Sequence, residues 1–284
     1  MFIGRLKSYK REGTKVDLLY VLLLGHALGD FYFQTDVEMK NKKESYISAL
    51  YHSLKYTVFV ALTVLVFFAK GNSSFFADFF LIIIPCIFAP HYIIDLCKTW
   101  VYGRKIRSSN LSFFDKVLRF GKKNLFFIDQ GLHIALLVVL VVFIGDNFIF
   151  FRSLDFLKDV ITRFPYPVFP TVLLYVYATK PVGIAIKEFF SNTKSITVEL
   201  ENNSELPRVG FLIGVLERLL LVTFILMGQY AVCAFVLTVK GLARFKELDN
   251  RVSAEYYIVG TFLSCVSAFT LKIIFMDFLP YVIL

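Results

Sequence analysis

Four histidines and three aspartates interrupt otherwise apolar stretches of this chain. The residues concerned are His26, Asp30, His52, His91, Asp95, Asp129 and His133. The set includes every histidine of the chain, and three of the four histidines have an aspartate four positions away. Residues four apart lie on one face of a helix with their side chains adjacent. The spacing therefore predicts an imidazole beside a carboxylate on three separate helices.

Imidazole and carboxylate groups together favour zinc, manganese or iron as a bound metal. We expect all seven residues to be metal ligands, with zinc preferred over manganese and iron. An aspartate can bridge two ions about 3.5–4 Å apart, so the set accommodates one or two ions. Because zinc lowers the pKa of a bound water to roughly 7, such a site suits hydrolysis of a phosphoester.

Basic side chains in the apolar stretches complete the predicted catalytic set. Lys98 follows His91 by seven positions and so continues the same helix face. Lys98, with Arg218 or Lys240, would hold an anionic group or stabilise developing negative charge. We count Asp30 among the catalytic residues as well as among the ligands. For Arg218 and Lys240 a structural role competes evenly, and Lys240 could extend to lipid phosphates as long basic side chains often do.

The composition is that of a membrane protein. Of the 284 residues 57% are hydrophobic and 19% are charged, and the mean hydropathy is +0.66. Soluble domains contain roughly 45–50% apolar residues, so lipid must be part of the solvent. Disorder, collagen, a coiled coil and a secreted disulfide scaffold are thereby excluded. The net charge of +9 is explained by membrane topology and anionic lipid, so we expect membrane lipids and not nucleic acid as partners.

The apolar stretches predict an all-α, polytopic bundle of about eight membrane spans. At about 20 residues per crossing, they lie near residues 17–35, 50–69, 75–99, 124–150, 167–190, 209–227, 230–246 and 255–278. We expect a basic N-terminal segment at 1–16, a four-helix His/Asp domain at 17–150 and a second four-helix domain at 151–284. A basic amphipathic loop at 100–123 would lie on anionic lipid. The sequence is also compatible with a homo-oligomer.

Alternating helix directions bring all seven His/Asp groups to one level, near one membrane interface. Loops on that side carry most of the Lys and Arg residues, and positively charged loops stay cytoplasmic. We therefore expect a multi-pass protein of a bacterial inner membrane, with its polar site near the cytoplasmic face.

Three functions remain open at this point. The preferred one is a metal-dependent hydrolase of a lipid-linked or amphiphilic phosphoester, because charged groups inside a bilayer are costly and usually functional. A metal-ion or proton-coupled transporter is the first alternative, but it needs polar groups continuing across the membrane. A membrane sensor or assembly protein is the second, and it predicts fully satisfied His/Asp pairs without a metal.

Three short motifs resemble those of an uncharacterised bacterial family of polytopic inner-membrane proteins. The motifs are His26-x-x-x-Asp30-Phe31-x-x-Gln34-Thr35, His91-x-x-x-Asp95-x-x-Lys98 and Asp129-Gln130-x-x-His133. This family carries a domain-of-unknown-function label, so the resemblance implies a membrane bundle and no particular activity. A looser similarity, in His and Asp residues near helix ends, is to membrane-bound proteins described as metal-dependent hydrolases.

Overall fold

The computed structural model describes the chain in several stretches. They comprise residues 13–68, 80–81, 84–104, 120–147, 168–191, 206–243, 245 and 251–282. Within these stretches the chain is helical, with short turns and no strand. The predicted all-α class is thereby confirmed. Most of the predicted N-terminal segment and basic loop, and the predicted domain boundary near 150, lie outside the described residues.

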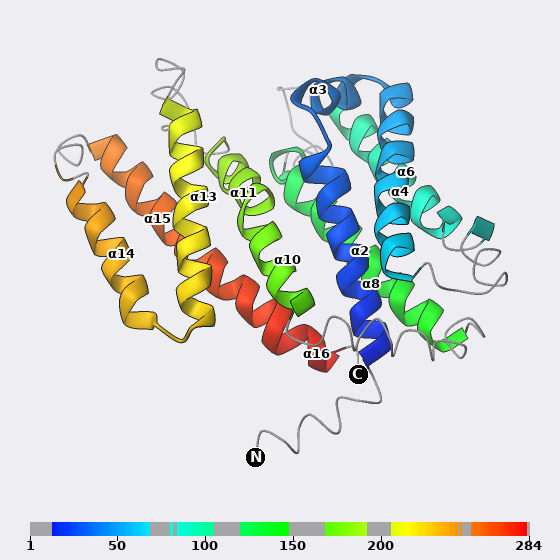
Figure 1. The fold of residues 1–284 in the computed structure, drawn as a ribbon. Helices are drawn as coiled ribbons and strands as arrows, with labels where there is room; N and C mark the ends of the chain where they lie inside the picture. Colours follow the sequence, from blue (N-terminus) through cyan, green and yellow to red (C-terminus); the bar gives the residue numbers. More distant parts are fainter. Residues whose placement is uncertain are drawn as a thin grey trace. The chain divides into compact units, whose positions relative to one another are not determined.

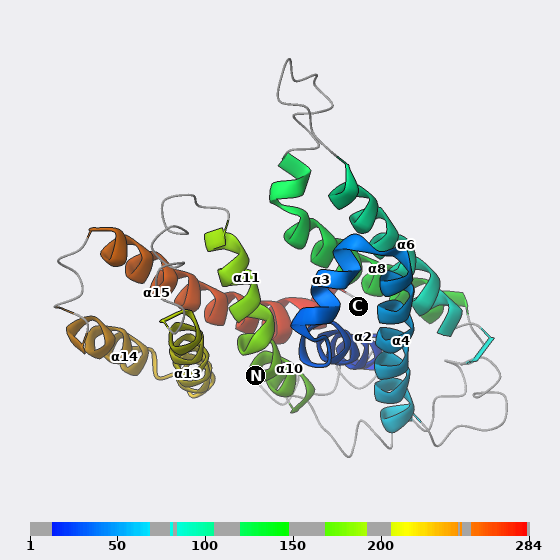
Figure 2. The same cartoon turned by 90° about the horizontal axis from the view of Figure 1, so that it is seen from above.

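Two compact units divide the chain, one formed mainly by residues 1–169 and the other by residues 170–282. The helices of the first unit are α2 (Gly13–Ala27), α3 (Asp36–Glu44), α4 (Tyr46–Phe68), α6 (Ile84–Gly103) and α8 (Leu125–Asn147). A π-helical stretch, η1 (Leu28–Tyr32), continues α2. Helix α2 packs against α4 and α8, and α6 packs against the same two helices (Figures 1 and 2). The four helices therefore form a closed ring.

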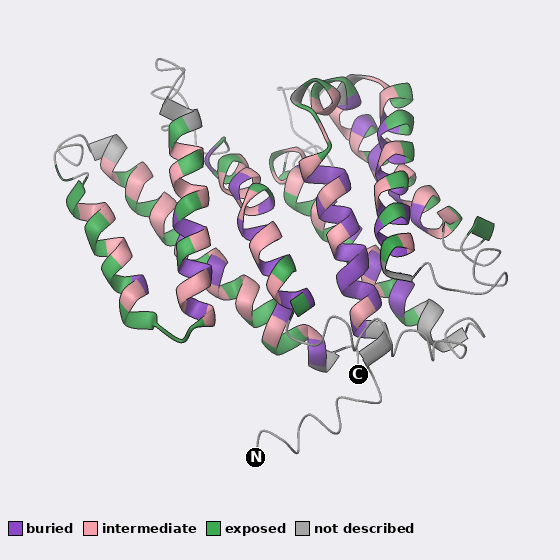
Figure 3. Cartoon of the chain, in the orientation of Figure 1, coloured by how far each residue is buried: buried purple, intermediate pink, exposed green. Residues whose placement is uncertain are grey.

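Figure 3 shows which parts of these helices are buried. The buried residues include the polar side chains of the seven-residue set. Helix α2 is buried along most of its length, with Leu19 and Tyr20 fully covered. On α4 the buried positions include His52, Ser53 and Tyr56. Large apolar side chains on the other faces remain exposed, as expected for helices whose outer surface meets lipid.

Two glycines allow α2 to approach α4 closely. A Cβ atom on Gly25 would lie 2.5 Å from Oγ1 of Thr63 and 2.9 Å from the Cα of Val60. A Cβ atom on Gly29 would lie 2.7 Å from the ring of Tyr56. Small residues four apart are a common means of close helix packing in membranes. This approach places the end of α2, with Asp30, against α4.

Replacing Gly25 with alanine is therefore expected to lower the free energy of unfolding by about 1–3 kcal/mol. The added methyl group meets the backbone of Val60, which cannot move aside as a flexible side chain can. Thermal unfolding in detergent micelles measures the loss. The matched control is Gly131→Ala in α8, where a Cβ atom meets nothing within 4 Å. A similar loss in both variants would contradict the close-packing account.

Helix α3 is a polar helix that the sequence analysis did not predict. It begins with a capping box, in which Thr35 and Glu38 each accept a hydrogen bond from the other's backbone N–H. Burial alone would raise the pKa of Glu38, but hydrogen bonds from Lys55 and from Thr35 outweigh it and hold the pKa below its ordinary value. The Glu38–Lys55 ion pair ties α3 to α4, and α3 also packs against α6.

The second unit contains the remaining helices. They are α10 (Val168–Ala178), α11 (Lys180–Ser191), α13 (Leu206–Leu226), α14 (Tyr230–Ala243), α15 (Arg251–Lys272), the π-helical η5 (Ile273–Phe278) and α16 (Leu279–Val282). Helix α13 packs against α11, α14 and α15. The chain turns between α13 and α14 at Gly228, whose φ of 71° lies in the left-handed region that favours glycine.

Among the described residues, five stretches of helix are long and apolar enough to cross a membrane, which indicates a membrane protein. They are Tyr46–Val66, Leu125–Val142, Val168–Ser191, Val209–Leu226 and Ala254–Phe278. Helix α14 is apolar but shorter. The predicted first and third spans correspond to α2 with η1 and to α6, neither of which is among the five stretches. The count of eight spans remains a prediction.

Candidate metal centre

The structure shows a buried cluster of histidine and aspartate side chains inside the ring of the first unit. Each of the four helices contributes at least one of the seven residues, and every one of them is 7% exposed or less. Asp30 comes from the π-helical η1, where the backbone N–H of Phe33 bonds to the carbonyl of Leu28 five residues back. Short π-helical stretches inside α-helices often occur at functional sites.

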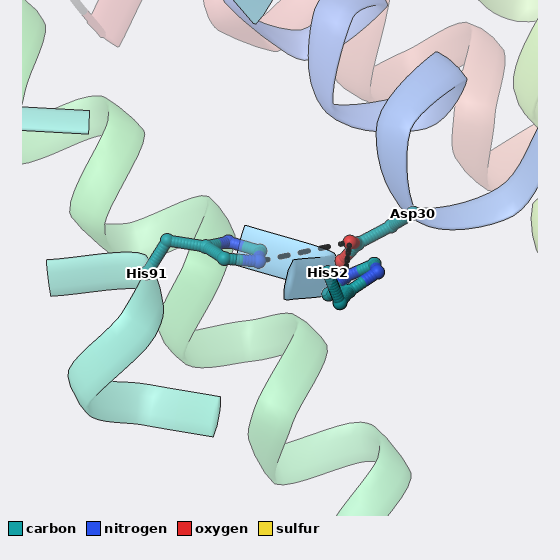
Figure 4. Close-up of side chains that lie close together, drawn as sticks. All are labelled: Asp30, His52 and His91. Carbon is teal, nitrogen blue, oxygen red and sulfur yellow. Dashed lines mark hydrogen bonds and ion pairs between the residues drawn. The ribbon is translucent and has the colours of Figure 1, made fainter. Parts of the chain in front are cut away.

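Asp30, His52 and His91 form one group of potential metal ligands (Figure 4). Nε2 of His52 lies 3.1 Å from Oδ1 of Asp30, and Nε2 of His91 lies 3.9 Å from the same oxygen. On its other side, Nδ1 of His52 lies 3.3 Å from the amide nitrogen of Gln34. Because that amide donates, Nε2 of His52 carries the proton that Asp30 accepts. This group is therefore held together by hydrogen bonds even without an ion.

His91, Asp95 and His133 form a second group that shares His91 with the first. Nε2 of His91 lies 3.4 Å from Oδ2 of Asp95, and the rings of His91 and His133 have their centroids 4.3 Å apart. Both ring nitrogens of His91 and Nε2 of His133 are buried without a hydrogen-bond partner. An unsatisfied buried polar group lowers the stability of the fold by about 1–3 kcal/mol. A ligand bound to these atoms would remove this cost.

The hydrogen bond of His133 fixes which of its nitrogens can bind a metal. Nδ1 lies 2.9 Å from the backbone carbonyl oxygen of Asp129. A carbonyl only accepts, so Nδ1 carries the proton and Nε2 of the neutral ring keeps its lone pair. Metal-ligating histidines commonly donate their other N–H to a backbone carbonyl in this way. The ring of His133 is thus oriented as a ligand.

The distances between the donor atoms suit a small divalent ion. Ligands placed about 2.0–2.1 Å from a tetrahedral zinc lie roughly 3.3 Å from each other. In the structure Nε2 of His91 lies 3.4 Å from Oδ2 of Asp95 and 3.9 Å from Oδ1 of Asp30. The buried His/Asp groups are therefore positioned to bind a metal ion.

His26 lies beside the two groups and belongs to neither. Its Nε2 donates to Oε1 of Gln130 over 3.2 Å, and its Nδ1 accepts from the hydroxyl of Tyr56 over 3.3 Å. Gln130 also reaches Oδ2 of Asp30 at 3.4 Å, and the ring of Tyr56 stacks on His91 at 3.7 Å. In this arrangement His26 orients the groups around it. Its predicted role as a direct ligand stays a prediction.

Asp129 is paired with a lysine at the edge of the cluster. Nζ of Lys98 lies 2.5 Å from Oδ2 of Asp129, which also accepts from Gln130 at 3.2 Å. The other oxygen, Oδ1, is buried without a hydrogen-bond partner. The expected proximity of Lys98 to the cluster is therefore present, while Asp129 lies outside the two ligand groups.

Lys42 is a site residue that sequence analysis missed. It lies on α3, is 6% exposed, and its Nζ lies 2.6 Å from Oδ1 of Asp95. Thr99 of α6 donates to the backbone carbonyl of Lys42 over 2.9 Å, which anchors this end of α3. In the sequence, Lys42 looks like one of several loop lysines. The Thr35-x-x-Glu38 capping box does indicate a helix, but only tertiary packing brings Lys42 to Asp95.

Arg218 and Lys240 lie in the second unit, so their predicted role in anion binding stays a prediction. Within that unit Lys240 pairs with Glu217. Arg218 donates to the backbone carbonyls of Ala178 and Thr179 and to Oγ of Ser264. These contacts join three helices, and they give Arg218 a structural role in its own unit.

The comparisons with known proteins assign no activity to this chain. Residues 18–156 match the family model described as "Protein of unknown function (DUF3307)". The expected resemblance to a family with a domain-of-unknown-function label is thereby confirmed. The matched region contains all seven His/Asp residues, Lys42 and Lys98, and it ends before Arg218 and Lys240. The chain matches no curated protein and no solved structure.

Proposed function

We propose that the first unit is a metal-dependent hydrolase domain that acts on a phosphoester of a lipid-linked or amphiphilic substrate. This proposal rests mainly on three buried atoms near the carboxylate of Asp95, both ring nitrogens of His91 and Nε2 of His133, which have no hydrogen-bond partner. A purely structural cluster would satisfy these atoms by hydrogen bonds. Their lack of hydrogen bonds counts against a sensor or assembly role based on fully paired histidines.

The chain's own residues take distinct parts in this proposal. His91, Asp95 and His133 would hold the ion, and Asp30 and His52 form the second ligand group with His91. A bound zinc would polarise the phosphoryl group and lower the pKa of a water molecule at the site. Lys98 would turn from Asp129 to the phosphate and stabilise the charge that develops on it.

The distribution of polar residues favours a one-sided site over a transport path. Beyond His133, α8 continues through residues 134–144 with apolar side chains alone. A transporter needs polar groups along this route. We further propose that the protein lies in a bacterial inner membrane with the cluster near the cytoplasmic face. The lysines and arginines in the loops at that end support this placement.

Phosphate release from phosphatidic acid in detergent micelles tests the proposed function. Protein loaded with zinc is expected to release phosphate, a chelator is expected to stop the reaction, and added zinc is expected to restore it. Lys98→Met should lower the rate by about 100- to 1,000-fold, as does loss of a transition-state donor in other enzymes, while the zinc content is kept. The control is Lys55→Met, because Lys55 pairs with Glu38 and neither residue belongs to a ligand group. A rate of phosphate release that the chelator does not change would contradict the proposal. Equal rates in the Lys98 and Lys55 variants would contradict it as well.

A further inference from the structure

The charges within the cluster nearly balance in the absence of an ion. Three carboxylates, Asp30, Asp95 and Asp129, face two ammonium groups, Lys42 and Lys98. With the four imidazoles neutral, as metal ligands must be, one negative charge remains. It belongs to Asp30, because among the described residues no lysine or arginine lies within ion-pair distance of this carboxylate.

The two ligand groups share His91, and this limits the number of ions that they can bind. A neutral imidazole offers one lone pair, so His91 cannot serve both ligand groups at once in its neutral form. A second divalent ion would also leave three surplus positive charges in a cluster that is almost completely buried. Buried charges without partners are strongly unfavourable. The geometry and the charges together favour a single divalent ion.

One divalent ion changes the net charge of the cluster from one negative to one positive. The ammonium group of Lys42 cannot easily move away from this positive charge, because Lys42 is buried and its backbone is anchored by Thr99. Once Asp95 binds the ion, its attraction for the ammonium of Lys42 is weakened by the ion's charge. The loaded cluster therefore lacks one negative charge next to Lys42.

We propose that the loaded centre binds a phosphate-type oxyanion together with the single metal ion, and that Lys42 makes the two binding events depend on each other. The inference rests on the proposed function for its metal site. It adds a binding determinant from α3, outside the four helices that carry the ligands. Because coupling between two ligands is reciprocal, the ion raises the affinity for the anion by the factor by which the anion raises the affinity for the ion.

Zinc titration of the metal-free, full-length protein tests the inference, with and without saturating methylphosphonate as the soluble probe. We expect one zinc per chain and a zinc affinity that rises at least about tenfold with the probe, within the usual range of coupling between ligands. Lys42→Met should reduce the rise to less than about twofold, because the loaded centre is then neutral. Lys42→Arg keeps the charge and should retain the coupling. Lys55→Met should behave as the parent protein does, since its partner is Glu38.

Phosphatidic acid in phosphatidylcholine nanodiscs replaces methylphosphonate in a second arm, which distinguishes a lipid headgroup from a free phosphate as the source of the anion. Coupling in either arm that depends on Lys42 supports the inference. Zinc binding without coupling, coupling that survives in Lys42→Met, or two zinc ions per chain would overturn it and leave the proposed metal site standing. A parent protein that binds no zinc would overturn both. Size-exclusion chromatography of each variant confirms that it is folded.

Discussion

His91→Ala protein is expected to lose zinc affinity by at least about 100-fold, the upper end of what loss of an outer-shell partner costs. His91 is the one residue that belongs to both ligand groups, so its removal leaves each of them with two donors. Equilibrium zinc titration of the purified protein measures the loss.

The control for this prediction is His26→Ala, another buried histidine four residues from an aspartate. Its ring nitrogens bond to Tyr56 and Gln130, so its loss should act on the ligands only through these neighbours. Such indirect effects amount to about 10- to 100-fold in metal affinity. An unchanged zinc affinity in His91→Ala would show that the ligand groups are wrongly assigned. A larger loss in His26→Ala than in His91→Ala would make His26 the ligand.

Arg218→Met is expected to destabilise the second unit by about 1–3 kcal/mol, the cost of leaving a buried hydrogen-bonding group unsatisfied. Arg218 is 2% exposed and bonds to Ala178 and Thr179, at the junction of α10 and α11, and to Ser264 of α15. The guanidinium thus supplies donors to backbone carbonyls at the break between these two helices.

Thermal unfolding in detergent measures this loss. Zinc titration of the same variant shows whether the metal site of the first unit is left intact. The structural role predicts a lower Tm with unchanged zinc affinity. Arg218→Lys should recover part of the stability, because a single ammonium group cannot reach all three acceptors as the planar guanidinium does. A variant with an unchanged Tm would contradict the structural role. It would favour the predicted role of Arg218 in holding an anionic group.

Local spacing predicted the parts of the site that depend on one helix. His91 and Asp95, four residues apart, lie 3.4 Å from each other, and His26 and Asp30 lie 3.8 Å apart. These distances follow from helix periodicity alone. Composition likewise predicted the all-α class, because lipid-exposed backbone must satisfy its hydrogen bonds within each helix.

The sequence predicted that these groups meet at one level of the membrane but not which side chains contact each other between helices. The partners of His26 are Tyr56 on α4 and Gln130 on α8, and no spacing rule connects residues so far apart in the chain. Lys42 lies in a polar segment that reads as a solvated loop, yet α3 folds it back onto α6. The π-helical turn at Asp30 likewise has no signal in the sequence pattern.

Zinc-edge X-ray absorption spectroscopy on protein loaded with one equivalent of zinc tests the central claim most directly. The account predicts only nitrogen and oxygen neighbours at about 2.0–2.1 Å, with the scattering pattern of imidazole rings. His133→Ala should weaken the imidazole signal. The chain also holds four free cysteines, Cys86, Cys97, Cys233 and Cys265. Sulfur neighbours at about 2.3 Å would show that the metal binds to these thiols and would contradict a His/Asp centre.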